Sequence, residues 1–403
     1  MREIFYYYLR KYDLGRKILL FGGVIFPGFS KFIYALIIKK QDGLGSLGVY
    51  SNDLAIIVVL SAISSLGFSA VLMNRVPGKI PAECNAIFTR VCFMAAITVL
   101  AFIPILFCLE FFGLLFNAVS SGIFLFGLTG YQLYRQFLFS LGDYGIVFFL
   151  ELSFIIIVPI LFVFIPYSNY LLIQGSFYVL FFCFVFLKNY STKVQLNWEE
   201  FKSGFRFGLA NLSSNILGSV SIPLANQMLG ITYAGFIGFV QPILSFIMVF
   251  PRSLSTYYVP AMVRVKEVPK ELSVLYSRYV GLNNFILLSF AVLIIGSWFL
   301  VKHFIPFSEI YVEYSSSIFI ILIINMFFSQ LGLPLFSILK VFDFSGISLI
   351  ANFSTLLVFL IGIPFLVSID GISGFVLVYI LLSVLYVTRF FVIRSVVKVK
   401  IRF

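Results

Sequence analysis

The chain has 403 residues, of which 61% are hydrophobic and only 11% charged, with a net charge of +12 and a mean hydropathy of +1.08. A soluble globular chain carries about 25% charged residues, because its surface must be wetted. This composition therefore excludes an ordinary soluble protein and predicts one that is embedded in lipid. One span takes about 20 apolar residues. The length therefore fits about twelve transmembrane helices, with no room for a soluble domain.

The first predicted span, 17–38, follows a basic N-terminal segment. Its apolar run is longer than that of a signal peptide and lacks a small-residue cleavage site, so we expect a retained helix. The other spans predicted before the polar break Lys188–Phe201 are 50–72, 89–110, 113–134, 146–166 and 169–187. The spans predicted after it are 204–224, 233–255, 279–300, 314–337, 346–368 and 372–393.

The basic residues predict the orientation. If the N-terminus is cytoplasmic and the spans alternate, all 28 Lys and Arg fall on the cytoplasmic side except Lys31, Lys39, Lys40 and Lys302. The positive-inside rule predicts this distribution, with both termini in the cytoplasm. The basic residues are dispersed over many segments rather than gathered in one patch, which argues against a nucleic-acid partner. Anionic lipid headgroups account for them better.

The polar break divides the chain evenly, into six-span halves at 1–190 and 191–403. Each half has a short outer segment after its first span, Leu44–Tyr50 in one and Leu229–Phe236 in the other, with a Leu-Gly pair followed by another glycine. An even number of spans gives both halves the same orientation. The pattern favours a parallel internal repeat, one of the common transporter architectures.

The familiar motifs of enzymes are absent from the sequence. There is no P-loop, HExxH, GxSxG or dinucleotide fingerprint, so we expect neither an ATPase nor an enzyme, with no catalytic residue and no cofactor. The four cysteines have no CxxC spacing and no histidine near them, so a disulfide framework or metal site is not expected. The one histidine, His303, is predicted to lie in a short loop.

Two charged residues near the outer ends of the first spans are candidates for function. An ammonium within a span costs about 2.5–3.5 kcal/mol on insertion scales, so Lys31 either faces a central cavity or extends its stem to the interface. Asp53, at the start of the second span, could meet Lys31 across the hairpin. A buried pair costs less than either charge alone. It would be either structural or a gate.

The seventh span carries a polar stripe. Asn211, Asn215 and Ser219 recur every four residues and so share one helix face. Such a stripe either packs against a neighbouring helix or lines an aqueous cavity. Gln227 and Gln241 continue the polar character. Arg252 and Glu151, near cytoplasmic ends of spans, are more often interface residues; the abundant Phe and Tyr indicate lipid-facing bulk and aromatic belts.

Several short motifs resemble those of polysaccharide flippases in the MOP (multidrug/oligosaccharidyl-lipid/polysaccharide) exporter superfamily, particularly the Wzx-type O-antigen branch. The motifs are Leu44-Gly45-x-x-Gly48-Val49-Tyr50-Ser51, Leu66-Gly67-Phe68 followed by Arg75, Phe201-Lys202-x-x-x-Arg206-Phe207-Gly208-Leu209, and Ala234-Gly235-Phe236. At Ala225-Asn226-Gln227 the chain lacks a charge pair that relatives often carry before Met228-Leu229-Gly230, so no role of that pair is carried over.

The resemblance implies a MATE/MOP-like fold and a flippase that moves an undecaprenyl-pyrophosphate-linked oligosaccharide to the periplasmic leaflet of the bacterial inner membrane. Lys31 and Arg252 would suit the pyrophosphate, and Asn211, Asn215, Gln227 and Gln241 the sugar hydroxyls. Alternating access between the halves would carry the head group across. Coupling to H⁺ or Na⁺ would involve Asp53 or Glu151, and the polymerase and chain-length proteins of the pathway would be partners, along with membrane lipids.

Three alternatives stay open. A small-solute or drug antiporter of the same superfamily would be expected to have a more acidic cavity. An O-antigen polymerase has similar length and span number, but usually carries a large periplasmic loop, and the outer loops predicted here are short. A scaffold protein would need neither Lys31 nor the polar stripe.

Overall fold

Helices account for all regular secondary structure in the part of the chain that the structure describes. The structure, a computed structural model, describes residues 2–77, 79–165, 170–192, 197–304, 312–342, 344–369 and 371–401. These residues form two compact units, Met1–Pro223 and Leu224–Phe403, which are described separately. The prediction of an all-α polytopic fold is confirmed.

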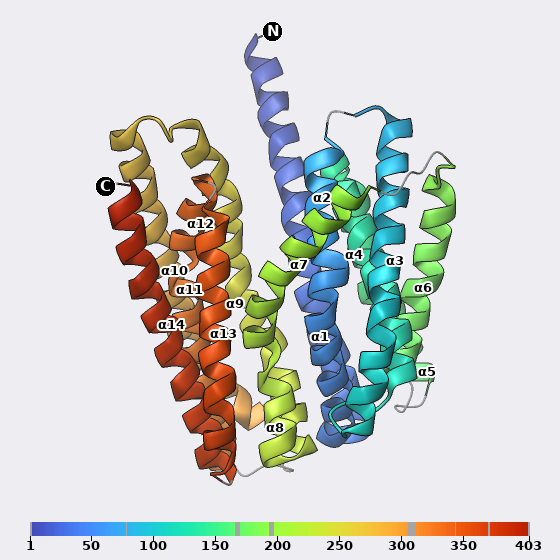
Figure 1. Ribbon diagram of the computed structural model, residues 1–403, viewed down its shortest axis with the longest axis vertical. Coiled ribbons are helices and arrows are strands. Elements are labelled where there is room, and N and C mark those ends of the chain that lie inside the picture. The colour runs from blue at the N-terminus through green and yellow to red at the C-terminus, as the bar shows by residue number, and fades with distance from the viewer. Residues whose placement is uncertain are drawn as a thin grey trace. The chain divides into compact units, whose positions relative to one another are not determined.

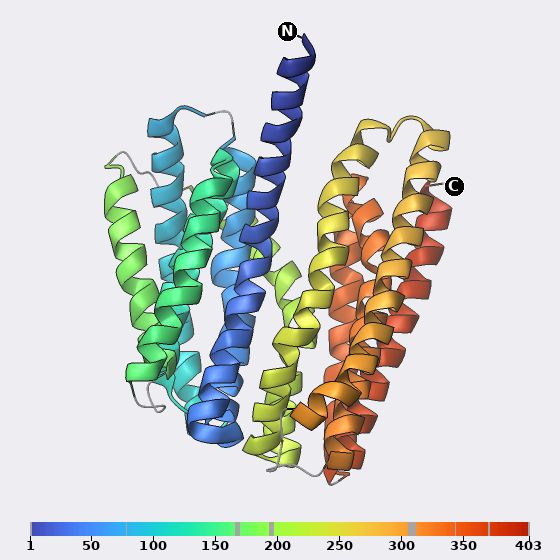
Figure 2. The ribbon, with the colours of Figure 1, turned by 180° about the vertical axis from the view of Figure 1, so that it is seen from behind.

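Unit 1 is a bundle in which successive helices run in alternating directions (Figure 1). Its elements are α1 (Arg2–Ser61), η1 (a π-helix, Ala62–Gly67), α2 (Phe68–Arg75), α3 (Pro81–Phe111), α4 (Ala118–Leu141), α5 (Tyr144–Phe164), α6 (Tyr170–Asn189) and α7 (Trp198–Ser219). The α2–α3 and α4–α5 connections lie at the same end of this unit as the N-terminus, as the predicted alternation requires (Figures 1 and 2).

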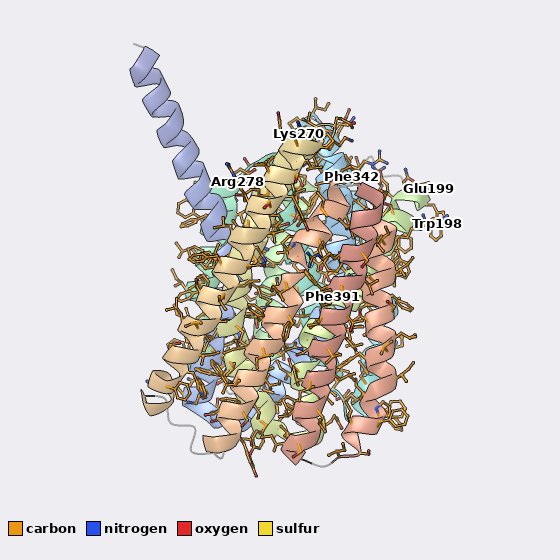
Figure 3. The ribbon with its side chains drawn as sticks, turned by 90° about the vertical axis from the view of Figure 1, so that its left-hand side faces the viewer. Trp198, Glu199, Lys270, Arg278, Phe342 and Phe391 are labelled. Atoms are coloured by element: carbon orange, nitrogen blue, oxygen red, sulfur yellow. The ribbon has the colours of Figure 1, made fainter. Side chains whose placement is uncertain are left out.

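Unit 2 is a second bundle that begins inside a short helix. Its elements are α8 (Ser221–Leu229), α9 (Ile231–Arg264), α10 (Pro269–Phe304), α11 (Val312–Leu331), α12 (Leu333–Val341), α13 (Ser345–Val367) and α14 (Gly371–Ile401). Lys270 and Arg278 of α10 lie toward the same end of this unit as Phe342 (Figure 3). Phe391 of α14 lies farther from that end (Figure 3). His303, predicted in a loop, belongs to α10, and its side chain lies outside the described residues.

The two compact units differ in extent from the predicted repeat halves, because α7 packs on unit 1 rather than beginning the second unit. The halves 1–190 and 191–403 were defined by a repeat in the order of the spans and not by contacts. This repeat stays a prediction.

Eight stretches of the described residues are long and apolar enough to cross a membrane. They are Ile25–Met73, Pro81–Phe111, Tyr144–Phe164, Tyr170–Asn189, Pro269–Phe299, Tyr314–Leu339, Gly346–Val367 and Gly371–Val397, and Ile231–Ser245 is a shorter apolar helix. The first stretch contains two arms of a hairpin, because α1 turns at Gly43. The described helices follow the order of the predicted spans along the chain.

One glycine makes the first turn of each predicted half. Gly43 has φ 81° and ψ −176°, and Gly230, between α8 and α9, has φ 93° and ψ 170°. This backbone region is open essentially to glycine alone. The predicted outer segments Leu44–Tyr50 and Leu229–Phe236 are therefore largely helical, because one glycine reverses the chain where a loop was expected. The shared conformation of the two turns is what a repeat would produce.

Small residues allow helices of unit 1 to approach closely. A Cβ on Gly127 of α4 would lie 2.7 Å from the carbonyl oxygen of Gly175 on α6, and one on Gly175 would lie 2.8 Å from the backbone of Phe124. Close packing through small residues is the usual way in which helices associate in lipid. The predicted span 113–134 is shifted, because α4 begins after the Asn117 N-cap and ends at Gly142 in the left-handed region.

The crossing of η1 and α7 unites two of the sequence motifs. A Cβ on Gly67 would lie 2.2 Å from the carbonyl oxygen of Gly204 and 2.7 Å from the backbone nitrogen of Gly208. Gly67 belongs to the Leu66-Gly67-Phe68 motif, and Gly208 to the motif that opens the seventh span. These residues therefore keep two backbones in contact, and no other residue fits there without displacing a helix.

Candidate functional site

A buried ion pair lies in the interior of unit 1. The carboxylate of Glu151, on α5, is 2% exposed and lies 2.8 Å from Nε of Arg135 on α4. The hydroxyl of Tyr131, one turn before Arg135, donates a hydrogen bond to the same carboxylate oxygen. A buried carboxylate requires such partners, because an unpaired charge in the interior is expensive. The pair thus fixes α4 against α5.

The same arginine also holds α1. Nη2 of Arg135 donates to the carbonyl oxygen of Gly23 at 2.7 Å. In a regular helix this carbonyl would accept from the amide of residue 27, but residue 27 is proline and has no amide hydrogen. Arg135 thus replaces the missing donor. Through it, the ionisation of Glu151 is linked to the one helix position of α1 that proline weakens.

Aromatic residues extend this network along the bundle. The rings of Tyr131 and Tyr178 are stacked with centroids 5.0 Å apart, and Phe154 meets both rings edge-on. The hydroxyl of Tyr178 accepts from Nε2 of Gln174 at 3.1 Å, and Oε1 of Gln174 accepts from the Tyr50 hydroxyl at 2.7 Å. Side chains of α1, α4, α5 and α6 therefore form one connected polar and aromatic core.

The π-helix η1 joins this core from another side. The hydroxyls of Ser64 and Thr129 lie 2.9 Å apart, and Ser65 donates to Oε1 of Gln132. π-Helical turns inside helices occur frequently at functional sites. Here the turn places two serines of the second span against α4, while Gly67 at its end touches α7.

Asp53 lies in a different cluster. Its carboxylate is buried and accepts from the backbone amides of Phe116 at 3.0 Å and Asn117 at 3.2 Å, and from the Asn52 side chain at 3.2 Å. Asn117 is the N-cap of α4, where its own side chain accepts from Ser120 N. In the described part of the chain, Asp53 thus takes its hydrogen bonds from the α3–α4 connection rather than from Lys31. This geometry favours a structural role for Asp53.

The remaining predicted residues of unit 1 lie at its surface or are partly buried. Lys31 is exposed on α1, and Asn211 is exposed on α7, whereas Asn215 and Ser219 are half-buried there. The polar stripe of α7 is thus accessible in unit 1 at Asn211. Neither asparagine belongs to the cluster around Glu151.

In unit 2, Gln227 of α8 is exposed and Gln241 of α9 is half-buried. Arg252 belongs to α9, with its side chain outside the described residues. The sequence did not single out Arg389 of α14, whose Nη1 donates to Oδ1 of Asn352 at 2.8 Å. Its guanidinium carbon lies 5.0 Å from the centre of the Phe336 ring and 4.7 Å from that of Tyr386. Rings stabilise this cation in place of a carboxylate.

Arg135, Tyr131 and Pro27 were also missed as site residues. Arg135 was assigned to the cytoplasmic end of a span on charge alone. The spacing of Tyr131 and Arg135, four residues apart on one helix face, was an available signal. Their meeting with Glu151 and Gly23 depends on tertiary packing and has no sequence pattern. Within the described residues, no group of His, Cys, Asp and Glu could hold a metal ion.

Comparison with known protein families and with curated proteins gave no match. Solved structures do match. With an inward-facing multidrug resistance MATE family transporter of the MOP superfamily, the TM-score is 0.63 at 15% identity, over 94% of each chain. An outward-facing MATE family transporter gives 0.63 at 14% identity, over 95% of this chain and 94% of that one. A MOP superfamily transporter from Pyrococcus furiosus, described as having a binding pocket of reverse polarity, gives 0.56 at 14%, over 94% of each chain.

The chain is therefore a multi-pass, all-helical membrane protein with a transporter fold. More particularly, its fold is that of MATE family transporters of the MOP superfamily. Identities near 15% establish the fold, and the activity has to be argued from the site.

Proposed function

We propose that this chain is a flippase of the MOP type that moves an undecaprenyl-pyrophosphate-linked oligosaccharide, such as an O-antigen unit, from the cytoplasmic to the periplasmic leaflet of a bacterial inner membrane. The observation that carries the proposal is the state of the three carboxylates that are buried in the described part of unit 1, those of Asp53, Glu151 and Glu200. Glu200 pairs with Arg90 at 2.8 Å. Glu151 is neutralised by Arg135, and Asp53 is satisfied by backbone amides and Asn52.

A carrier of cationic drugs needs a carboxylate that can pair with the drug. In a cavity of low dielectric, the charge of the lining selects the ligand, because opposite charges attract and like charges repel. The three buried carboxylates of unit 1 already have protein partners. Lys31 is an exposed residue on a membrane-spanning helix. A diphosphate is the kind of head group that such a cation attracts.

In this proposal, Lys31 and Arg252 receive the diphosphate. Asn211, Asn215, Gln227 and Gln241 bind sugar hydroxyls, for which amide side chains offer both donors and acceptors. The prenyl tail stays in the lipid while the two halves rock to expose the head group on alternate sides. The polymerase and chain-length proteins of the same pathway would receive the product.

Glu151 is the better candidate for coupling, and the proton the better candidate for the coupling ion. Protonation of its carboxylate would remove the charge that holds Arg135. Arg135 also supplies the Gly23 carbonyl with its donor, so the proton would alter the support of α1 near Pro27. Asp53, held by the α3–α4 connection, would serve as a structural anchor.

A drug antiporter is the second candidate, because solved structures with this fold include a multidrug resistance transporter and a MATE multidrug transporter in complex with a ligand. The two candidates differ in the charge of what is transported. One preparation of the protein can therefore be tested for both.

The test is translocation in proteoliposomes. Protein is reconstituted with a fluorescent undecaprenyl-pyrophosphate oligosaccharide, and the fraction of head groups accessible to an external glycosidase is followed in time. The proposal predicts protein-dependent exposure that is lost in Lys31→Ala and largely kept in Lys31→Arg. Lys79→Ala is the matched control, since Lys79 is an exposed lysine paired with Glu83 at the surface.

Accumulation of a cationic dye such as rhodamine, with no exposure of the lipid-linked sugar, would establish the antiporter instead. Equal rates for Lys31→Ala and wild type would remove Lys31 from the mechanism. If Lys31→Ala failed to fold, the thermal unfolding of the purified variant would reveal it.

A further inference from the structure

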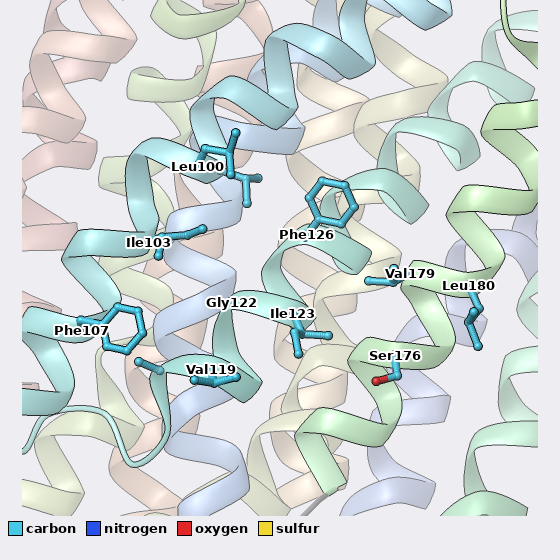
Figure 4. Close-up of a pocket in the computed structure, with 12 residues that line it drawn as sticks. Leu100, Ile103, Phe107, Val119, Gly122, Ile123, Phe126, Ser176, Val179 and Leu180 are labelled. Atoms are coloured by element: carbon cyan, nitrogen blue, oxygen red, sulfur yellow. The ribbon is translucent and has the colours of Figure 1, made fainter.

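An apolar groove runs along the outside of unit 1 between α3, α4 and α6 (Figure 4). Its volume is about 680 Å³. Eleven of the twelve residues that line it have no polar side chain, and the exception is Ser176 of α6. The groove is separate from the core around Glu151 and from every residue assigned to the proposed head-group site.

The groove exists because small residues form its floor. Ala118 and Gly122 lie on α4, and Ser176 lies opposite on α6, whereas Leu100, Phe107 and Leu180 stand at its sides (Figure 4). The three larger side chains are 61%, 50% and 71% exposed, although they are fully apolar. A Cβ on Gly122 would meet Leu106 at 3.7 Å, an ordinary contact, so the space is free.

The surroundings of the groove are hydrocarbon. α3 and α6 are two of the apolar stretches that can cross a membrane. The lining residues extend from Val99 to Phe107 on α3 and from Ala118 to Phe126 on α4, which corresponds to about 12 Å along each helix. One leaflet contributes about half of the roughly 30 Å hydrocarbon core. The groove therefore has the length of a lipid chain in one leaflet.

A charge beyond the lining residues, near the C-terminal end of α3, selects the head group. Ile103, Phe107 and Glu110 follow one another at helical spacing on α3, so they share a face, and Glu110 stands beyond the last lining residue. It is partly exposed, and no ion pair to it occurs among the described residues. The C-terminal end of α3 adds the negative end of a helix dipole. A cation is therefore favoured at this end, and a diphosphate is disfavoured.

We propose that this groove is a binding site for a phospholipid with an amine head group, such as phosphatidylethanolamine. One acyl chain lies between α3, α4 and α6, and the ammonium group contacts Glu110. The lipid is a resident of the protein rather than the transported substrate. The proposal does not depend on the function proposed above.

The test uses purified protein in nanodiscs made of equal amounts of phosphatidylethanolamine and phosphatidylcholine with identical acyl chains. Lipid that remains after detergent extraction is identified by native mass spectrometry. Wild type should retain one lipid per chain, with phosphatidylethanolamine enriched about threefold, as one partly exposed ion pair would provide.

Two substitutions distinguish binding of the acyl chain from recognition of the head group. Gly122→Leu should fill the groove and lose the retained lipid. Glu110→Gln should keep a lipid but bind both head groups equally. The matched control is Gly281→Leu, which makes the same change on α10 at an exposed glycine where a Cβ meets no atom within 4 Å. Ser176→Leu fills the groove from the other wall, in case Gly122→Leu does not fold.

Retention by Gly122→Leu and Ser176→Leu equal to that of wild type would overturn the proposal, as would a wild type that retains no lipid. Enrichment of phosphatidylcholine would refute the role of Glu110. Retention of a prenyl diphosphate, offered in a second nanodisc series, in preference to phosphatidylethanolamine would identify a different occupant and contradict the proposal.

Discussion

Arg135 donates a hydrogen bond to the carbonyl oxygen of Gly23, at 2.7 Å, in place of the amide that Pro27 lacks. The same guanidinium pairs with Glu151. One side chain thus neutralises a buried acid and repairs a helix interrupted by proline. A proton on Glu151 would act on both.

Removing Arg135 should destabilise the protein strongly, because Glu151 would be left as a buried and unpaired charge. Arg135→Met should lower the free energy of unfolding by about 3–5 kcal/mol, and Arg135→Met with Glu151→Leu should recover most of it. Thermal unfolding of the purified variants measures this. If the double variant is no more stable than the single one, the ion pair is not the cause. A stable but inactive double variant would support the coupling role of Glu151.

The roles of Pro27 and Arg135 should be coupled. Pro27→Ala restores a helical donor to the Gly23 carbonyl, so the hydrogen bond from Arg135 becomes less important. A double-mutant cycle of Pro27→Ala and Arg135→Met should give a coupling energy of about 1 kcal/mol. The control pair is Pro104→Ala with Arg135→Met, since Pro104 lies in α3 and should add independently. Additive effects for Pro27 would contradict the interpretation.

The two turn glycines should tolerate no side chain. Gly43→Ala and Gly230→Ala should each cost about 1–3 kcal/mol, because their backbone conformation is accessible essentially to glycine alone. Gly45→Ala is the matched control, in a helix with no atom within 4 Å of a new Cβ, and should be neutral or stabilising. Unfolding temperatures in one detergent compare the three. Equal effects at Gly43 and Gly45 would be inconsistent with a turn at Gly43.

The crossing of η1 and α7 should depend on the absence of a side chain at Gly67. Gly67→Ala places a methyl group 2.2 Å from the Gly204 carbonyl oxygen, so the helices must separate at a cost of about 1–3 kcal/mol or more. Gly218→Ala, in the same α7 but without a close atom, should be harmless. Fluorescence size-exclusion profiles would show aggregation of the first variant only. A monodisperse Gly67→Ala protein with unchanged stability would disprove the close contact.

Asp53 should act as an anchor of the α3–α4 connection. Asp53→Asn weakens the charge-assisted hydrogen bonds to Phe116 and Asn117, each worth about 1.5–3 kcal/mol. Hydrogen–deuterium exchange of residues 112–117 should therefore become faster, with transport retained. Loss of transport with unchanged exchange would return Asp53 to the coupling role predicted from the sequence.

The sequence by itself determined the membrane environment, the helical class and the order of the spans. In lipid, the backbone N–H and C=O groups of apolar runs such as Tyr144–Phe164 must be hydrogen-bonded within the protein, and only a helix satisfies them within one segment. It also identified Asp53 as unusual, because a charge within a span has a cost that is independent of its neighbours. Glu151 was interpreted as an interface residue and became a coupling candidate only through the family resemblance. It overestimated the length of the first turns, since the conformation of Gly43 is a property of the backbone and not of a residue pattern.

The tertiary structure alone decided what those charges do. Glu151 and Arg135 lie on different helices, and their meeting depends on how α4 packs against α5 and α1. Asp53 met the α3–α4 connection rather than Lys31, because backbone amides at a helix N-terminus are donors that no sequence motif marks. The sequence can show where a charge is costly, whereas only the packing of helices determines which partner offsets that cost.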